Sequence, residues 1–283
     1  MPEGPEIRLL KEKFNDKISE KKIFSIELLG KNKNDNIIEP SPIIVMGCKG
    51  KLLFIQTNDY YLHLRMGLTG FLFDKCEMNK INVDDKNNAT YNTSMIDLQN
   101  VKYKLNFGEN YSLFLNDTKK LSSINILKNT MDHEKELEKM GADILSKEFT
   151  FEYLEGKIKS KKIGLTYFLM DQKYLSGVGN YIKNESLYIS KIHPKRKTNE
   201  LNYLEIKNLY DAIKLVSFSV LLTHLEREEI EIPNEIKSII PKNVEVPYNY
   251  HVYKQTKDQE GNDVIFEKIG GRNTYYAPYT QIK

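Results

Sequence analysis

The stretch "YLSGVGNYIKNESLY", residues 174–188, places two glycines between segments whose apolar residues follow helical spacing. Gly177 and Gly179 predict a tight turn, and Asn180 opens the helix that follows it. Backbone N–H groups at such a helix start, together with the Asn180 amide, can bind a phosphate. A plain helical hairpin is the alternative interpretation. A dinucleotide-binding turn is excluded, because Ile182 stands where the third glycine would be and the segment before the turn follows helical spacing instead of a strand pattern.

Basic residues gather around this turn. Residues 157–197 contain ten Lys or Arg residues but only two acidic ones, Asp171 and Glu185. A basic face of this kind favours a polyanion partner, whose phosphates supply most of the non-specific affinity. The alternative is a solvated helical surface, and the net charge of +3 is too small to decide. The basic residues nearest the turn, which favour binding of a DNA or RNA backbone, are Lys173, Lys183, Lys191, Lys195 and Arg196.

The spacing of hydrophobic residues divides the rest of the chain into strand-like and helical segments. Residues 22–73 and 101–120 hold short β-branched and aromatic runs broken by Gly, Pro and Asn, which predict strands. Residues 134–228 follow helical spacing, and residues 248–281 return to a strand pattern with Gly-containing turns. The polar, aperiodic residues 74–100 are interpreted as an inserted loop. The sequence therefore predicts an α+β fold: a leading helix and a β-sandwich or barrel, then helices that end in an antiparallel β-hairpin.

Length and composition describe a globular protein. The 283 residues are 40% hydrophobic and 29% charged, which is enough for one or two domains with a substantial core. No apolar run approaches the ~18–20 residues that a membrane crossing needs, and the N-terminus lacks the pattern of a secretory signal. The two cysteines, Cys48 and Cys76, fit a reducing compartment and exclude a zinc site built from cysteines alone. We therefore expect an intracellular protein without a membrane partner.

The first six residues, "MPEGPE", raise a separate question. Gly4 and Pro5 are typical of a helix start, and the residues behind them follow helical spacing. Pro2 and Glu3 are not explained by that helix. The sequence leaves open whether they are a frayed end or a reactive one.

The segment "DQKYLSGVGNYIKNESLYISKIHP", residues 171–194, resembles the helix–two-turn–helix of the formamidopyrimidine-DNA glycosylase and endonuclease VIII family. Members of that family begin with Pro-Glu, and the endonuclease VIII branch begins with "PEGPE", as this chain does. Other family landmarks follow in the same order from the first residue to the last: "KGKLLF" at 49–54, "MGLTG" at 66–70, "NDTKKL" at 116–121, "MGADIL" at 140–145 and "GGRNTYYAP" at 270–278.

The resemblance implies a catalytic role for the N-terminus. Removal of Met1 would free the secondary amine of Pro2, which could attack the sugar of a damaged nucleotide and expel the base as an iminium forms. Glu3 would transfer protons, and Glu6 would support the site. Lys51, in the "KGKLLF" motif, would keep the amine unprotonated by its charge and hold a phosphate. The alternatives are a helix-start acid for Glu3 and a solvent-facing lysine for Lys51.

The resemblance also assigns DNA contacts. Asn180 and Arg272, in the tail motif "GGRNT", would bind phosphate. Leu68, Lys120 and Leu121 would fill the space left by a flipped base, although relatives commonly have Met, Arg and Phe there. Relatives with a zinc finger have cysteines in the tail, whereas this chain has none after Cys76. We therefore expect no metal and no cofactor, but a zincless hairpin held by strand pairing and by packing among Tyr250, Tyr253, Phe266, Tyr275 and Tyr276.

These implications give one expected organisation. Residues 1–130 would form the N-terminal helix and β-sandwich of the catalytic domain, residues 131–247 the helix–two-turn–helix domain, and residues 248–283 the zincless hairpin. The chain would be an endonuclease VIII-like glycosylase and abasic-site lyase for oxidised bases, mainly pyrimidines, with hydantoins as an addition. Its partner would be damaged DNA, double-stranded and also single-stranded, and the enzyme a monomer. It would work wherever the DNA is, in the cytoplasm of a prokaryote or in a nucleus or viral factory.

Two alternative functions stay open. The helix–two-turn–helix element also occurs in a ribosomal protein, so a nucleic-acid-binding protein without catalysis is one of them. Pro2, Glu3 and Lys51 argue against it, because a protein that only binds has no need of all three. The other is an abasic-site lyase that has lost recognition of damaged bases, which the departures at Leu68, Lys120 and Leu121 keep open.

Overall fold

The structure is a computed structural model, and it describes residues 2–29, 35–36, 38–78, 98–108 and 110–281. The chain forms two compact units. The first consists of residues 1–2, 13–48 and 52–134, and the second of residues 3–12, 49–51 and 135–283. The long N-terminal helix α1 (Gly4–Ile18) contributes residues to both units. The α+β fold class predicted from the sequence is confirmed, whereas the division into three domains stays a prediction.

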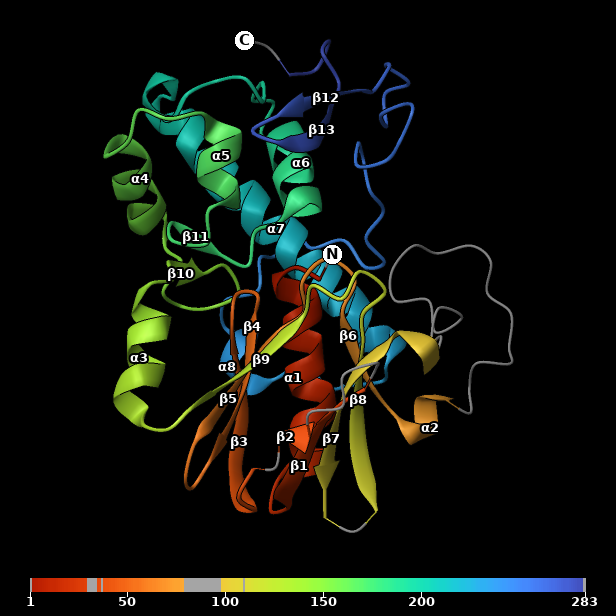
Figure 1. Ribbon diagram of the computed structural model, residues 1–283. Helices are drawn as coiled ribbons and strands as arrows, with labels where there is room; N and C mark the ends of the chain where they lie inside the picture. The colour runs from red at the N-terminus through yellow and green to blue at the C-terminus, as the bar shows by residue number, and fades with distance from the viewer. Residues whose placement is uncertain (1, 30–34, 37, 79–97, 109, 282–283) are drawn as a thin grey trace. The chain divides into compact units, whose positions relative to one another are not determined.

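The first unit is built on one antiparallel sheet with the strand order β6-β8-β7-β1-β3-β4-β5-β9, and β2 pairs with β1. Figure 1 shows β3, β4, β5 and β9 in one half of the sheet and β1, β7, β8 and β6 in the other. The strands are β1 (Lys22–Leu28), β2 (Asp35–Asn36), β3 (Ser41–Lys49), β4 (Leu52–Thr57), β5 (Tyr61–Arg65), β6 (Phe71–Asp74), β7 (Val101–Phe107), β8 (Tyr111–Asn116) and β9 (Ser123–Leu127).

Alternation along these strands directs apolar side chains inward. In β4, for example, Leu53 and Ile55 are fully buried while Phe54 and Gln56 are only partly covered. The end of α1 adds Phe14 to the same core. Burial of each such side chain stabilises the fold by about 1.5–3 kcal/mol. The fully buried side chains of this unit include Ile18, Ile23, Met46, Leu62, Leu105, Phe107 and Leu115.

The interpretation of residues 74–100 as a loop was wrong at both ends. Asp74 ends β6 and is followed by the short helix α2 (Lys75–Met78), and a 3-10 turn, η2 (Leu98–Asn100), leads into β7. Asp74 caps α2, since its carboxylate accepts from the backbone N–H groups of Cys76 and Glu77. Residues 79–97 lie outside the described residues.

The second unit is mainly helical. Its longest helix, α7, begins behind Asn202, whose side chain accepts from the N–H of Glu205, and the Glu205 carboxylate accepts from the N–H of Asn202 in return. Thr150 caps α4 in a similar way. The helices are α3 (Thr130–Glu138), which the two units share, α4 (Phe151–Lys159), α5 (Leu165–Met170), α6 (Asn180–Ile189), η3 (Thr198–Glu200), α7 (Tyr203–Arg227) and α8 (Asn234–Lys237). None of the described helices combines the length and apolar character that a membrane crossing needs.

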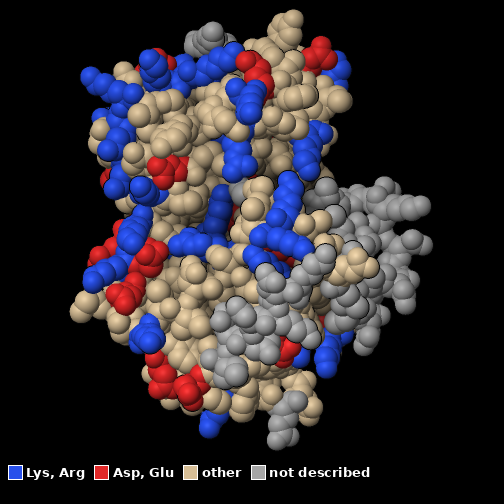
Figure 2. All heavy atoms as spheres, in the orientation of Figure 1, with Lys and Arg blue, Asp and Glu red and all other residues tan. Residues whose placement is uncertain are grey.

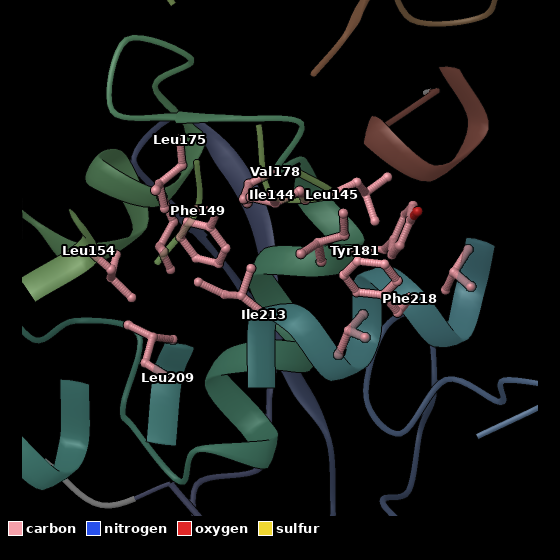
Figure 3. Packing of buried hydrophobic residues seen from close by; sticks show 14 of the residues in the cluster. Ile144, Leu145, Phe149, Leu154, Leu175, Val178, Tyr181, Leu209, Ile213 and Phe218 are labelled. Atoms are coloured by element: carbon pink, nitrogen blue, oxygen red, sulfur yellow. The ribbon is translucent and has the colours of Figure 1, made fainter. Parts of the chain in front are cut away.

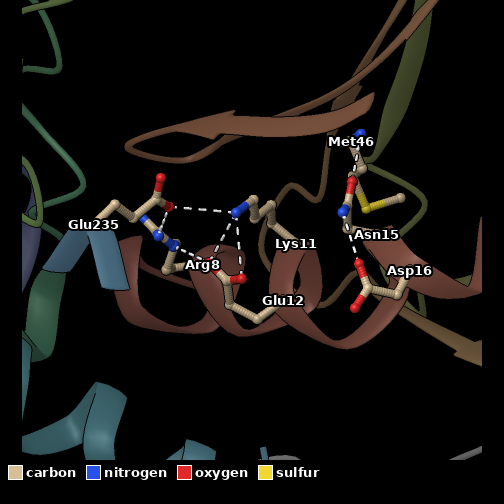
Figure 4. A network of polar contacts seen from close by, with 7 residues as sticks. All are labelled: Arg8, Lys11, Glu12, Asn15, Asp16, Met46 and Glu235. Carbon is tan, nitrogen blue, oxygen red and sulfur yellow. Dashed lines mark hydrogen bonds and ion pairs between the residues drawn. The ribbon is translucent and has the colours of Figure 1, made fainter. Parts of the chain in front are cut away.

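These helices enclose one apolar core (Figure 3). Phe149, Leu154 and Phe168 pack there with residues of the glycine turn and of α7. Arg8 and Lys11 of α1 are ion-paired with Glu235 of α8 and with Glu12, a network drawn in Figure 4. Partly exposed pairs of this kind add little stability individually. The apolar core is therefore the main source of stability in this unit.

Two short strand pairs complete the unit. β10 (Ala142–Asp143) pairs in parallel with β11 (Leu175–Ser176) just before the glycine turn. β12 (Ile265–Ile269) and β13 (Arg272–Tyr276) form the predicted antiparallel hairpin, with Gly270 and Gly271 at positive φ in its turn. Strand structure in the tail is confined to this hairpin and to one isolated antiparallel bridge between Lys257 and Asp263, so the strand pattern expected from residue 248 onward was too long. Residues 248–264 contain no strand.

Candidate functional site

The N-terminus of α6 binds the carboxylate of Glu3. Oε1 of Glu3 accepts from the backbone N–H of Tyr181 at 2.9 Å, and Oε2 accepts from that of Ile182 at 3.2 Å. The helix begins at Asn180, behind Gly179, as the sequence predicts. A Cβ at Gly179 would lie 2.2 Å from the Cδ of Glu3, so this position has no room for a side chain. The predicted phosphate seat at the N–H groups of Tyr181 and Ile182 was therefore wrong, because a carboxylate of the same chain binds there.

The start of α1 is fixed against the same turn. The N–H of Gly4 donates to the carbonyl of Gly177 at 2.9 Å, and a Cβ at Gly4 would lie only 3.1 Å from the Cα of Gly177. The helix start at Gly4 and Pro5 is confirmed. Pro2 is joined to Glu3 by a peptide bond, so the held carboxylate lies one residue from the proposed nucleophile.

Glu6 is a second buried acid beside Glu3. One of its oxygens accepts from the N–H of Glu3 at 2.8 Å, and both lie within 3.1 Å of the Tyr181 hydroxyl. Nε2 of His224, on α7, lies 3.2 Å from Oε1 of Glu6. Burial acts to raise the pKa of Glu6, but the contacts with His224, Glu3 and Tyr181 outweigh it and lower the pKa. Glu6 is therefore held as a carboxylate.

For Glu3, the effect of burial on the pKa outweighs the effects of Lys51 and of the backbone hydrogen bonds, so the pKa is raised. The side chain is only 1% exposed, and burial raises its pKa to about 7. The nearby cation of Lys51 works against that rise, and the anion of Glu6 adds to it. A carboxyl with a pKa near neutrality can both give and take a proton at physiological pH, which is what a general acid–base catalyst needs.

Lys51 is placed by the glycine before it. Gly50 has a φ of +54°, and a Cβ there would lie 2.5 Å from the Cβ of Ser176, so only glycine fits. The backbone N–H of Gly50 donates to Oδ2 of Asp143 at 2.8 Å. Burial lowers the pKa of the Lys51 amine, Glu3 and Glu6 oppose that, and Arg272 adds to the lowering. Lys51, Glu3 and Glu6 therefore form one electrostatic group within the second unit.

The hairpin is attached to the start of α6. The amide Nδ2 of Asn180 donates to the carbonyl of Asn273 at 3.0 Å. Nζ of Lys183 donates to Oδ1 of Asn180 at 2.9 Å and to Oγ1 of Thr274 at 2.8 Å. Arg272, at the first position of β13, is exposed. Asn180 and Arg272, the two predicted phosphate ligands, thus lie at one junction of helix and hairpin.

A buried carboxylate holds the segment that leads to the hairpin. Glu185 of α6 is fully buried, and its two oxygens accept from the N–H groups of His251, Val252 and Tyr253 and from the Tyr248 hydroxyl, all within 3.0 Å. The predicted aromatic packing follows in the rings of Tyr250, Tyr253, Tyr275 and Phe266, whose successive centroids are 5.5 Å apart. Tyr276 packs against His193 instead.

The loops of the void-filling candidates belong to the first unit. Oγ1 of Thr69 donates to Asp117, and the N–H of Lys119 donates back to Thr69. A Cβ at Gly67 would lie 2.9 Å from the backbone of Leu121. Residues 66–70 and 117–121 are therefore in direct contact, as a shared role would require. Leu121 is 57% exposed, Leu68 is partly exposed, and Lys120 is exposed with a φ of +55°.

The basic residues around the turn do not act as one exposed group. Lys and Arg side chains do gather on the surface of the helical unit (Figure 2). Lys183, however, is fully buried. Lys195 is ion-paired with Glu267 and Arg196 with Glu205. The interpretation of Lys183 as a direct contact for a nucleic-acid backbone was therefore wrong, while the roles of the other four basic residues stay predictions.

Sequence reasoning missed several residues of the site. His224 stands in an apolar run of α7, and Glu185 was counted only as one of two acids in a basic stretch. A titratable residue within an apolar helical run was the available signal for His224, since such residues need a partner. Glu185 gave no such signal, because Lys183, Asn184 and Ser186 surround it. Tyr181 gave no signal beyond its place after Asn180. Among the described residues, no group of three or more His, Cys, Asp or Glu side chains could hold a metal ion.

The fold and the site define a protein of the helix–two-turn–helix class with a buried acid at the start of its second motif helix. Residues 140–246 match the family model of the formamidopyrimidine-DNA glycosylase H2TH domain. The formamidopyrimidine-DNA glycosylase of Rickettsia conorii is 31% identical over 226 residues, which cover 76% of each protein. The protein of the same name from Rickettsia felis is 31% identical over 228 residues, which cover 76% of this chain and 75% of that protein. The chain therefore belongs to the formamidopyrimidine-DNA glycosylase family, whose members are DNA glycosylases and abasic-site lyases of DNA repair.

Solved structures are similar across the whole chain. Lactococcus lactis Fpg in complex with DNA that contains an abasic site has a TM-score of 0.76 at 20% identity and covers 99% of this chain and 100% of that one. MutM in complex with DNA that contains carbocyclic 8-oxo-G has a TM-score of 0.74 at 19% identity and covers 100% of both chains. These similarities show that the fold is that of the family.

Proposed function

We propose that the chain removes oxidised bases, mainly pyrimidines, and then cleaves the abasic site by β,δ-elimination, with Pro2 as the nucleophile. The observation that carries this proposal is the buried carboxyl of Glu3, which is hydrogen-bonded to the start of α6 and has a pKa raised to about 7. A protein that only binds DNA gains nothing from burying an acid in this way, because an anion at a DNA interface repels phosphate.

The chemistry follows from the N-terminal sequence. Once Met1 is removed, the secondary amine of Pro2 attacks C1′ of the damaged nucleotide, the bond from C1′ to the base breaks, and the base leaves with the electron pair and takes up a proton. The sugar ring opens as its oxygen is protonated, and an iminium remains between Pro2 and C1′. Loss of a proton from C2′ then expels the 3′ phosphate, and a second elimination expels the 5′ phosphate.

Each proposed residue has one part in this sequence. Glu3 gives a proton to the ring oxygen or to the departing base. Lys51 disfavours protonation of the Pro2 amine by its charge, and Glu6 holds the backbone N–H of Glu3 in place. Asn180 and Arg272 bind phosphate, while Leu68, Lys120 and Leu121 fill the space of the flipped nucleotide. No metal or cofactor takes part in these steps.

The preference for pyrimidines rests on the sequence. The opening "PEGPE" and the tail without cysteines are features of the endonuclease VIII-like branch. Ala277 and Thr280 stand where the last pair of zinc ligands would fall, and the hairpin holds by other contacts, from Asn180 and Lys183. We propose that the chain belongs to this branch, with hydantoins and single-stranded DNA as further substrates, and that it works as a monomer wherever the DNA of its host is.

Borohydride trapping tests the chemistry, because the iminium is reducible and the protein then stays attached to the DNA. The substrates are duplexes with an abasic site, thymine glycol or 8-oxoguanine, and mass spectrometry first confirms that Met1 is absent. We expect adducts on the abasic site and on thymine glycol, fewer on 8-oxoguanine, and none with Pro2→Gly. Glu3→Gln should lose trapping on thymine glycol and keep some on the abasic site.

The other outcomes select the alternatives. Trapping on the abasic site alone would indicate a lyase that does not recognise damaged bases. Unimpaired DNA binding without any adduct would indicate a protein that only binds nucleic acid. Preferential trapping on 8-oxoguanine would remove the endonuclease VIII-like assignment while leaving the role of Pro2 intact.

A further inference from the structure

Lys183 is a fully buried lysine whose hydrogen bonds go to neutral oxygens. Its side chain is 0% exposed, and Nζ donates to Oδ1 of Asn180 and to Oγ1 of Thr274. Burying an ammonium is costly, and lysine is almost never fully buried unless it is paired. A methionine or leucine would fill the same volume at a lower cost, so the position has a requirement beyond packing.

One effect of the ammonium is to orient the amide of Asn180. An ammonium only donates hydrogen bonds, so it selects the oxygen of the amide and turns the NH₂ group away from itself. Nδ2 then faces the hairpin, where it donates to the carbonyl of Asn273. The donor group of the proposed phosphate ligand is thereby fixed before DNA arrives, and a phosphate oxygen can take over one of its hydrogen bonds.

The second effect is to join the helix to the hairpin. Thr274 is fully buried in β13, two residues after Arg272. With the bond from Asn180 to Asn273, the bond from Lys183 to Thr274 gives two polar links between the first turn of α6 and β13. Arg272 starts this same strand, so the links set where its backbone lies relative to Asn180. The tail has no cysteines that could fix it through a metal.

We propose that Lys183 is a positioning residue for DNA binding, which presents the Asn180 amide and Arg272 together as one preformed phosphate-binding site. This inference rests on the proposed phosphate-binding role of these two residues. Lys183 would act through Asn180 and Thr274 without touching the DNA. Two charged groups face the Lys183 amine: Glu3 favours its protonated form, and Arg272 disfavours it. Burial outweighs the effect of Glu3 and lowers the pKa of the amine to about 8.

Two variants separate positioning from folding. Lys183→Met removes the ammonium, while Thr274→Val removes one hydroxyl with almost no change of shape. We measure the Kd for a duplex with a tetrahydrofuran abasic-site analogue by fluorescence anisotropy, and the lyase rate at saturating abasic-site DNA. Each variant should weaken binding by about tenfold, as expected for the loss of a hydrogen bond to a charged group, and leave the saturated rate within about threefold. Thr274→Ser, which keeps the hydroxyl, should restore the wild-type Kd.

Coupling and pH give further readouts. Because both substitutions break the same bond, Lys183→Met combined with Thr274→Val should bind no worse than Lys183→Met alone. The wild-type Kd should rise between pH 7 and pH 9, as the ammonium is lost, by more than the Kd of Lys183→Met does. Lys214→Met is the control, since Lys214 is a partly buried lysine of α7 that lies over the rings of Tyr210 and Phe218. It should leave the Kd unchanged.

Three results would overturn the inference: wild-type affinity in Lys183→Met, additive losses in the double variant, or a saturated rate that falls while the Kd stays constant. The last would mean that Lys183 acts on Glu3. The Kd measurement does not depend on catalysis. If wild-type protein gave no borohydride adduct, the proposed chemistry would fail while the Kd series still decided the role of Lys183.

Discussion

Nε2 of His224 lies 3.2 Å from Oε1 of Glu6, and this contact joins the long helix α7 to the first turns of α1. Both residues are at most 5% exposed. The other oxygen of Glu6 accepts from the backbone N–H of Glu3. His224 therefore holds the Glu6 carboxylate in place, and that carboxylate in turn fixes the backbone N–H of Glu3.

Replacing His224 should destabilise the protein and slow its chemistry. In His224→Leu the Glu6 carboxylate loses a buried partner, which costs about 3 kcal/mol in the free energy of unfolding at pH 7. His224→Gln keeps an N–H donor of similar reach and should lose less than half of that. Urea denaturation of both variants, with the rate of thymine glycol excision, checks the prediction. Equal losses of stability in the two variants would mean that the contact between His224 and Glu6 stabilises the protein only through packing.

The pKa of Glu3 gives the stability of the protein a defined pH dependence. The ordinary value for glutamate is 4.5, and the folded-state value is about 7. Between these values the folded protein binds the proton more tightly than the unfolded chain, so the free energy of unfolding falls as pH rises. Glu3 contributes its full stabilisation below about pH 4.5 and has lost about 3 kcal/mol above pH 7.

Glu3→Gln removes this dependence, because an amide does not titrate. The difference in unfolding free energy between Glu3→Gln and wild type should therefore shift by about 3 kcal/mol in favour of the variant between pH 4.5 and pH 8. Urea titrations at intervals of half a pH unit would measure it. A difference that stays constant with pH would show that Glu3 has an ordinary pKa in the folded protein.

Gly179→Ala should slow catalysis by at least about 100-fold and leave the fold intact. The backbone at Gly179 is extended, with φ −128° and ψ −156°, so alanine is not strained there. Its Cβ, however, would lie 2.2 Å from the Cδ of Glu3 and would push that carboxyl off the helix start. Misplacing a reacting group by about 1 Å can cost about 100-fold in rate. Single-turnover excision assays should show at least that loss.

Gly156→Ala is the matched control for that variant. Gly156 lies in α4, and a Cβ there would meet nothing within 4 Å. Alanine should stabilise this helix by up to about 1 kcal/mol and leave the excision rate unchanged. If Gly179→Ala stayed active, Glu3 would not need the position in which the structure holds it.

Several parts of this arrangement were accessible from the sequence for a physical reason. The glycine turn before Asn180 could be predicted because backbone geometry and close approach restrict that place to glycine. The order of strands and helices followed from the change of hydrophobic period. In both cases the signal is local, since it depends on residues that are close together in the chain.

The rest of the site depends on contacts between distant residues. Nothing near Lys183 or Glu185 distinguishes them from the exposed charges of a basic stretch, and only the fold shows that both are buried. His224 is 218 residues away from Glu6. Partners at such separations leave no periodic pattern, and without a series of related sequences they cannot be paired in advance.

Arg272→Met should weaken DNA binding in a manner that depends on salt. If the exposed guanidinium neutralises one phosphate, its loss lowers the slope of log Kd against log salt concentration by about 0.9. Lys268→Met is the control, because Lys268 is exposed on β12 of the same hairpin, opposite Asn273 in the strand register. Anisotropy titrations between 50 and 300 mM salt (roughly the range in which such slopes are linear) would compare the two. An equal slope change in both variants would mean that the hairpin attracts DNA by its general charge.

Leu121→Ala tests the space-filling role of the loop at 117–121. Leu121 is 57% exposed, so its truncation should change the free energy of unfolding by less than about 0.5 kcal/mol. If the side chain occupies the space left by a flipped nucleotide, its removal exposes apolar base surface to water and raises the Kd for abasic-site DNA by about tenfold.

Ile44→Ala provides the comparison for Leu121→Ala, since Ile44 is 52% exposed on β3 of the same unit. It should change neither the stability nor the Kd. The Leu121 effect should also be larger on double-stranded than on single-stranded DNA, because only the duplex has a stacked partner strand that collapses into the vacated space. Equal effects on both substrates would remove Leu121 from the void-filling set, and the same assay on Leu68→Ala and Lys120→Ala would then identify which side chain fills the space.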